Sequence, residues 1–351
     1  MRFIHISDIH IGAKPDSSMP WSEARAREIL ESFYGILNLC EEQQVDLLLI
    51  AGDIFHKQPL LRDLKELNYH FGKLTKTQVV MIAGNHDYIG PKSNYIDFPW
   101  ESHVHMLQSS EIESIYLEEL NTEVYGFSYP MRNIKEAPAI DYMKIKEDRY
   151  NILLYHGGEE KYAPINLNEL KTSNFDYIAL GHIHKPQLLY GKMAYAGSLE
   201  PLDKNELGER GYIEGELTSS GLVYQFVPYS KRKYQPLEIV VRPEMTNGAI
   251  YDTIRENIQE AGEDNIYRIS LVGYRDMDLA ILEDEIKELG NVVEVVNDTV
   301  PDFDFMALSE ENKDNLIGLY IDKIHESNTA NDVKLKALYY GLEALLHCKM
   351  S

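Results

Sequence analysis

The sequence predicts an α/β protein in which two β-sheets pack face to face with helices outside them. A small α+β unit and C-terminal helices follow. In the first third of the chain, apolar strand patterns alternate with helical patterns, which is typical of parallel strands joined by crossover helices. Closely spaced strand patterns with few helices between them come next, and these indicate the rest of the two-sheet sandwich.

Three strands are predicted in the first part of the chain, at residues 2–7, 45–52 and 78–84. They are apolar on both faces, as in strands that are covered on both sides. Helices are predicted between them, at 22–42 and at 60–74, the second directly after Pro59. The order strand, helix, strand, helix, strand therefore implies a partly parallel sheet.

The later patterns divide the rest of the chain. Six more strands are predicted, at 122–128, 151–156, 176–181, 194–197, 212–217 and 222–227. A polar, basic segment bounded by prolines follows and resembles a linker, at 228–236. The small α+β unit has strands and helices in alternation, at 237–241, 245–261, 266–271, 278–289 and 292–296. Two amphipathic helices are predicted from Leu308 onward. We therefore expect domains at 1–230, 237–300 and 305–351.

The composition is that of a globular protein, with 44% hydrophobic and 26% charged residues. No apolar run approaches the roughly 20 residues that span a bilayer, and the N-terminus does not have the pattern of a signal peptide. The cysteines, Cys40 and Cys348, give no disulfide framework. We therefore expect a reduced, cytoplasmic protein without a membrane partner.

The formal net charge of −23 is unevenly distributed. Residues 1–234 have a net charge of −9, and residues 235–351 have a net charge of −14. Proteins that bind nucleic acid alone usually display a basic face. If DNA is the substrate, metals, a local patch or a partner must therefore contribute. The basic run at 231–233 is open to two interpretations, a solvated linker or a contact with the DNA backbone.

The most informative residues follow the predicted strands. Metal-capable side chains occur just after five strand ends, in the segments Asp8-Ile9-His10, Gly52-Asp53-Ile54-Phe55-His56, Gly84-Asn85-His86-Asp87, His156-Gly157 and Gly181-His182-Ile183-His184. Ligands of α/β sheets bind beyond the carboxyl ends of the strands. Imidazole, carboxylate and amide donors without thiolate suit manganese, iron or zinc better than calcium. Asp53 is the natural bridge, because one carboxylate can bind two ions. Two cations could then activate a water and clamp a phosphate.

The order of these five segments resembles that of the calcineurin-like metallophosphoesterase family, over about residues 1–230. The resemblance implies a two-sheet sandwich flanked by helices and two divalent metal ions, most often manganese. It also implies that one metal is held by Asp8, His10, Asp53 and His184, and the other by Asp53, Asn85, His156 and His182. His86 would lie nearby, stabilising charge or protonating the leaving oxygen.

Two further segments are similar to SbcD-type DNA repair nucleases. These are the continuation of the Asp53 segment to His56, and the run at 195–201, Tyr-Ala-Gly-Ser-Leu-Glu-Pro. The resemblance implies a DNA exonuclease or endonuclease in which His56 faces the scissile phosphate. It further implies a capping domain at 237–300, C-terminal helices that bind an SbcC-like ATPase, and a homodimer formed through the helices at 22–42 and 60–74.

Two other functions remain open at this point. One is a phosphodiesterase or phosphatase for a small nucleotide or a phosphoprotein, which the negative charge favours. The other is a scaffold that has lost catalysis, which the complete set of candidate ligands disfavours.

Overall fold

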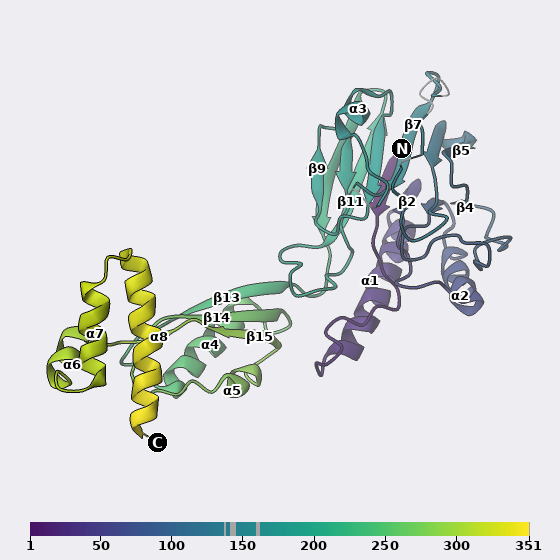
Figure 1. Cartoon of the computed structure of the whole chain (residues 1–351). Helices are drawn as coiled ribbons and strands as arrows, with labels where there is room; N and C mark the ends of the chain where they lie inside the picture. Colours follow the sequence, from purple (N-terminus) through teal and green to yellow (C-terminus); the bar gives the residue numbers. More distant parts are fainter. Residues whose placement is uncertain (137, 141–144, 159–161, 351) are drawn as a thin grey trace. The chain divides into compact units, whose positions relative to one another are not determined.

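The computed structural model describes residues 1–136, 138–140, 145–158 and 162–350, and it confirms the predicted fold class. The chain divides into two compact units, Met1–Tyr234 and Gln235–Ser351 (Figure 1). Among the described residues, no helix is both long enough and apolar enough to cross a bilayer. The predicted strand-end residues all lie in the first unit.

The first unit contains two six-stranded sheets. The first sheet has the order β12-β11-β1-β2-β3-β4, and its strands β1 to β4 are parallel. In chain order these strands are β1 (Arg2–Ile6), β2 (Leu47–Ala51), β3 (Gln78–Ile82), β4 (Val104–Leu107), β11 (Gly211–Thr218) and β12 (Gly221–Pro228). Because β1, β2 and β3 are parallel, their carboxyl ends meet at one edge of the sheet.

The second sheet has the order β5-β6-β7-β8-β10-β9, and β6, β7, β8 and β10 are parallel to their neighbours in that run. In chain order its strands are β5 (Glu113–Leu117), β6 (Thr122–Gly126), β7 (Tyr150–His156), β8 (Tyr177–Gly181), β9 (Gln187–Leu189) and β10 (Met193–Tyr195). A 3₁₀ turn, η1 (Glu118–Leu120), joins β5 to β6. The carboxyl ends of β7 and β8 also lie side by side.

The two sheets pack through one apolar layer, which contains residues such as Leu49, Val80, Ile152 and Ala179. On its other face the first sheet packs against α1 (Ser22–Glu42) and α2 (Leu61–Phe71). The buried residues of α1 recur at helical spacing, at Ile29, Phe33, Ile36, Leu37 and Cys40. The outer face of the second sheet has its own core, which includes Leu170 of α3 (Leu167–Thr172).

The second unit has a small sheet in which β13, β14 and β15 are neighbours and β16 pairs with β14. Its strands and first two helices are β13 (Tyr234–Val241), α4 (Asn247–Ala261), β14 (Ile266–Arg275), α5 (Glu283–Lys287), β15 (Val292–Asn297) and β16 (Val300–Pro301). Three helices follow, α6 (Phe305–Glu311), α7 (Leu316–Glu326) and α8 (Asn331–Met350). They share a separate core that includes Ile321 and Leu342.

Several sequence-based boundaries were wrong. The predicted helix at 278–289 is only the five-residue α5, and three helices stand where two were expected near the C-terminus. Helix α6 was missed although Asp304 caps it by accepting hydrogen bonds from the backbone of Met306 and Ala307. Strands β4, β5 and β9 were missed because they are three to five residues long and only partly buried.

The basic run at 231–233 is held by acidic side chains. Lys231 pairs with Glu31 of α1, Arg232 Nη2 lies 2.8 Å from Glu28 Oε1, and Lys233 Nζ lies 2.7 Å from Glu209 Oε1. The side chains of Lys231 and Lys233 remain partly exposed, at 43% and 35%, and the run lies next to the boundary between the two units, which agrees with a solvated linker. The acidic partners offset the charge of the run, which weighs against a contact with the DNA backbone.

Candidate metal centre

Loops from both sheets bring together all seven side chains that the sequence suggested as metal ligands. The loops after β1, β2 and β3 come from the first sheet, and those after β7 and β8 come from the second. Backbone hydrogen bonds join the first two loops, from Asp8 N to Gly52 O at 3.1 Å and from His10 N to Asp53 O at 3.0 Å. The parallel register of β1 and β2 thus fixes the spacing of these side chains.

Four of these seven residues have positive backbone φ angles. The φ angles of Asp8, His10 and Asp53 are 49°, 53° and 51°, and that of His182 is 91°. Such conformations are uncommon for residues other than glycine and cost on the order of 1–3 kcal/mol each. Gly84 leaves room for the arrangement, because a Cβ atom there would collide with the carboxylate of Asp53. The strain is concentrated at the loops that carry the candidate ligands.

The first donor group consists of Asp8, His10, Asp53 and His184. His10 Nε2 lies 3.2 Å from His184 Nε2 and 3.7 Å from Asp53 Oδ2. His184 Nε2 lies 3.8 Å from Asp8 Oδ1. Asp8, His10 and Asp53 are buried, and the side chain of His184 is 27% exposed. Their donor atoms are near enough to surround one ion.

The second donor group consists of Asp53, Asn85, His156 and His182. The amide oxygen of Asn85 lies 3.0 Å from His156 Nε2 and 3.1 Å from His182 Nδ1. His156 Nε2 lies 3.5 Å from Asp53 Oδ2, the same oxygen that faces His10 in the first group. Asp53 therefore stands between the two groups, as expected for a bridging carboxylate.

Burial and charge set the protonation of this cluster. Burial would raise the pKa of Asp53, but the charge of His156 beside it holds the pKa of that carboxyl below its ordinary range. Burial also works against protonation of His156, yet Asp53 raises the pKa of His156 to about 9. Burial lowers the pKa of His182 to about 3 and that of His10 well below its ordinary value. The proton of this pair therefore resides on His156, opposite the carboxylate of Asp53.

The donor set fits divalent cations. Buried imidazole nitrogens that face one another, as in His10 and His184, repel through their lone pairs unless a proton or a cation lies between them. A cation would satisfy both nitrogens together with the nearby carboxylates. Nitrogen and oxygen donors without thiolate are typical of manganese, iron and zinc sites.

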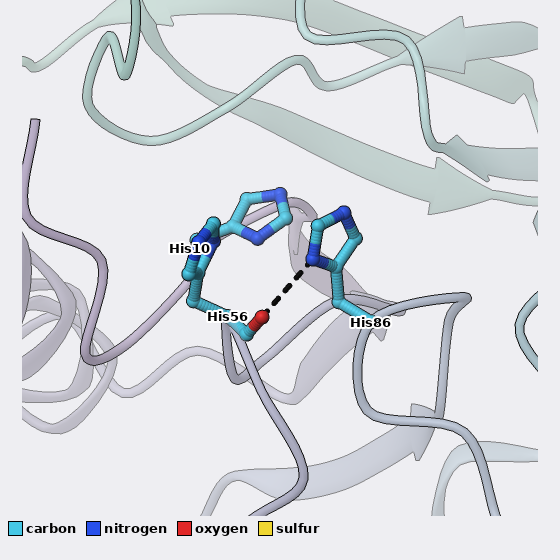
Figure 2. A group of neighbouring side chains, drawn as sticks. All are labelled: His10, His56 and His86. Carbon is cyan, nitrogen blue, oxygen red and sulfur yellow. Dashed lines mark hydrogen bonds between the residues drawn. The ribbon is translucent and has the colours of Figure 1, made fainter.

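The two histidines suggested for catalysis lie beside the first donor group (Figure 2). The rings of His10 and His86 are 4.7 Å apart between centroids, and those of His10 and His56 are 5.4 Å apart. His86 donates its backbone N–H to Asp53 Oδ1 at 2.8 Å, and its Nδ1 lies 3.0 Å from His56 O. These contacts leave His86 Nε2 available to a ligand at the centre.

Two carboxylates that the sequence reasoning gave no role also belong to the site. Asp87 accepts hydrogen bonds from the backbone of Gly84, Ile54 and Phe55 and from the hydroxyl of Tyr95 at 2.9 Å. It therefore ties the loop after β3 to the loop after β2. The position of Asp87 at the end of the Gly-Asn-His-Asp segment could have indicated from the sequence that it belongs to the site.

Glu206 is the second such carboxylate. Its Oε1 lies 2.6 Å from His184 Nδ1. No motif in the sequence marks it, because its contact with His184 depends on how the loop before β11 folds back.

Comparisons with known proteins identify the family of the chain. The family model described as calcineurin-like phosphoesterase matches residues 1–186. The chain is 29% identical over 245 residues to an uncharacterized metallophosphoesterase, YhaO, of Bacillus subtilis, covering 64% of this chain and 60% of that protein.

Two further relatives have names that refer to nucleases or DNA repair. The DNA double-strand break repair protein Mre11 of Methanocaldococcus jannaschii is 29% identical over 222 residues, covering 59% of this chain and 58% of that protein. A component of the nuclease SbcCD of Escherichia coli is 23% identical over 287 residues, covering 68% of this chain and 70% of that protein. The chain thus spans about three fifths of the length of the Bacillus and Methanocaldococcus proteins.

Proposed function

The chain belongs to the calcineurin-like phosphoesterase family, and from that premise we propose that it is a DNA nuclease of the SbcD type. It would use two metal ions to hydrolyse phosphodiesters during the processing of DNA ends or double-strand breaks. The observation that carries this proposal is the meeting of seven imidazole, carboxylate and amide donors around Asp53.

The two donor groups would each hold one divalent cation, with Asp53 shared between them. Manganese is our first choice, and iron or zinc are the alternatives for the same nitrogen and oxygen donors. When bound, the pair of ions supplies a water acidified for attack and positive charge against the phosphate. The protein contributes a buried and largely pre-formed arrangement, in which Asp8, His10 and His156 are at most 1% exposed.

His86 and His56 would act on the substrate. The backbone N–H of His86 is fixed on Asp53, and its Nδ1 is fixed on the carbonyl of His56, so its Nε2 faces the centre. There it would stabilise charge on the phosphate or protonate the leaving oxygen. His56 stands beside it, with 5.2 Å between the ring centroids, and would contact the scissile phosphate of DNA.

Partners are part of the proposal. The acidic charge of the chain argues that another protein supplies basic surface for DNA, and an SbcC-like ATPase is the partner we propose. Helices α6, α7 and α8 expose Met306, Leu316, Leu319 and Tyr340, which suits a docking surface. A homodimer through α1 and α2 is supported by the exposure of Leu61 and Tyr69 on α2.

A second candidate is a phosphodiesterase for a small nucleotide or a phosphatase for a phosphoprotein. The net charge of −23 favours it, because a small anionic substrate can be held by the metals alone. The same donor groups would serve that reaction, so the substrate distinguishes the two candidates.

The experiment compares substrates on one enzyme preparation. Purified full-length chain with Mn²⁺ is incubated with end-labelled duplex DNA, single-stranded DNA and a small chromogenic phosphodiester. Asp53→Asn is the matched loss-of-function control, and Asp97→Asn, an exposed residue outside the donor groups, is the control for substitution itself.

Degradation of DNA that disappears in Asp53→Asn is the expected result. Hydrolysis of the small diester with intact DNA would contradict nuclease action by the chain alone and favour the second candidate. In that case, the DNA assay is repeated with the ATPase partner added. Degradation of DNA only in its presence would show that the nuclease activity requires both proteins.

A further inference from the structure

We propose that Glu206 is a positioning residue that fixes the ring of His184, and thereby sets the affinity of one of the two metal ions. The inference rests on the proposed function, in which His184 belongs to the first donor group. It concerns a residue outside that group, which would not itself contact the metal ion.

The contact between the two side chains is short and specific. Glu206 Oε1 lies 2.6 Å from His184 Nδ1, a distance typical of a charge-assisted hydrogen bond. A carboxylate can only accept, so Nδ1 must carry the hydrogen. The other nitrogen, Nε2, faces His10 at 3.2 Å and Asp8 at 3.8 Å and is the one left to bind a cation. Glu206 therefore selects the nitrogen that His184 offers to a cation.

Glu206 is itself held in place. Its second oxygen, Oε2, accepts a hydrogen bond from the backbone of Leu202 at 3.1 Å and one from Ser198 Oγ at 3.4 Å. Arg210, which is 2% exposed, places its Nε 3.7 Å from the same oxygen. Arg210 is anchored in turn on the carbonyls of Leu207 and Glu209. The carboxylate thus has little freedom to leave His184.

The same loop also holds the backbone of His184. Ser198 donates its N–H to His184 O at 3.0 Å, and a Cβ atom at Gly197 would lie 2.6 Å from that oxygen. Gly197 also accepts a hydrogen bond from Ser7 Oγ, one residue before Asp8. The segment 197–206 therefore fixes the backbone of His184 through Ser198 and its ring through Glu206. This gives a physical role to part of the Tyr-Ala-Gly-Ser-Leu-Glu-Pro run.

The two donor groups differ in the kind of group that holds the histidine Nδ1 atom. In the second group, His156 Nδ1 is held by a backbone carbonyl, Ala51 O, at 2.8 Å. A carboxylate partner makes an imidazole a stronger electron donor than a carbonyl does, and loss of such a partner typically weakens metal binding 10–100-fold. Removing Glu206 should therefore weaken one metal and spare the other.

The test measures Mn²⁺ binding to the metal-free full-length chain by titration calorimetry. Glu206→Leu removes the acceptor, Glu206→Gln keeps an acceptor but removes the charge, and Glu209→Gln is a control on the same loop. We expect one of two binding events to weaken about 10–100-fold in Glu206→Leu, with a smaller loss in Glu206→Gln. The second event should stay within about twofold, as should both events in Glu209→Gln. Unchanged binding in Glu206→Leu, or an equal loss at both sites, would overturn the inference.

A second readout is independent of metal and activity, and it serves even if Glu206→Leu does not fold. Long-range ¹H–¹⁵N correlation spectra of the metal-free wild type identify the protonated nitrogen of each histidine. We expect Nδ1–H for His184 in the wild type and a tautomer mixture when the acceptor is lost. Nε2–H without Nδ1–H in the wild type would overturn the inference. Wild-type protein that binds fewer than two Mn²⁺ ions or cleaves no phosphodiester contradicts the proposed function instead, and these spectra still decide the role of Glu206.

Discussion

The Nε2 atoms of His10 and His184 lie 3.2 Å apart, although 174 residues separate the two histidines in the chain. One follows β1 of the first sheet, and the other follows β8 of the second. The candidate centre therefore exists only when both sheets are folded against each other. For the same reason, a cation bound there should stabilise the whole sandwich.

Metal binding should raise the thermal stability of the first unit. A ligand that binds only the folded state adds about 2.7 kcal/mol at one hundred times its dissociation constant. We expect Mn²⁺ added to chelator-treated protein to raise the unfolding temperature in a concentration-dependent manner. Differential scanning calorimetry checks this. Asp53→Asn should lose most of the rise and Asp97→Asn should keep it, whereas an equal rise in all three would place the metal elsewhere.

His86→Ala should remove turnover while the metals remain bound. The ring of His86 is bonded to the carbonyl of His56, and the contact with Asp53 is made by the backbone N–H of His86, which the substitution keeps, so the candidate ligands should stay in place. We expect the hydrolysis rate to fall by about 10²–10⁴-fold, the usual contribution of a general acid or charge-stabilising group. Metal content by inductively coupled plasma spectrometry should match the wild type. Unchanged turnover would exclude His86 from the mechanism.

His56→Ala should affect DNA more than a small substrate. His56 lies next to His10 and His86 and is partly exposed, where a phosphate of an extended strand would pass. We expect the rate of DNA degradation to fall further than the rate of small-diester hydrolysis, measured on the same preparation. Equal losses on both substrates would make His56 a structural residue only.

The sequence was most informative where function is carried by short local segments. Asp8 and Asp53 could be identified because each follows an apolar strand directly, and strand ends converge in an α/β sheet. Glu206 could not be identified, because its partner His184 is reached through an irregular loop that has no periodic pattern. Strand β9 was missed for a related reason, since three residues give too short a pattern. The ion pairs of Lys231 and Arg232 could not be predicted either, because their acidic partners lie on α1, about 200 positions away in sequence.

The buried ion pair of Arg25 and Glu200 should matter for stability. Nη1 and Nη2 of Arg25 both lie 3.2 Å from Glu200 Oε2, and both side chains are at most 1% exposed. Arg25→Met leaves the carboxylate buried without its partner, which typically costs about 3–5 kcal/mol. Urea unfolding measures the loss. The double variant Arg25→Met/Glu200→Met should recover much of it, and a double variant as unstable as the two single losses together would contradict the pairing.

Cys40 should be inert in the folded protein. It lies on α1 and is fully buried in the core against the first sheet, and burial raises the pKa of its thiol to about 12. The reactive thiolate is therefore much scarcer than for an ordinary thiol at neutral pH. In a Cys348→Ser background, a colorimetric thiol reagent should react with Cys40 only after unfolding in denaturant. Rapid reaction under native conditions would show that the α1 packing is wrong.

The central claim is that the two donor groups hold two cations with Asp53 between them. Anomalous diffraction at the manganese edge from crystals grown with Mn²⁺ tests it most directly. We predict two peaks, one contacted by Asp8, His10 and His184 and the other by Asn85, His156 and His182, with the carboxylate of Asp53 touching both. A single peak, or peaks away from Asp53, would contradict the account.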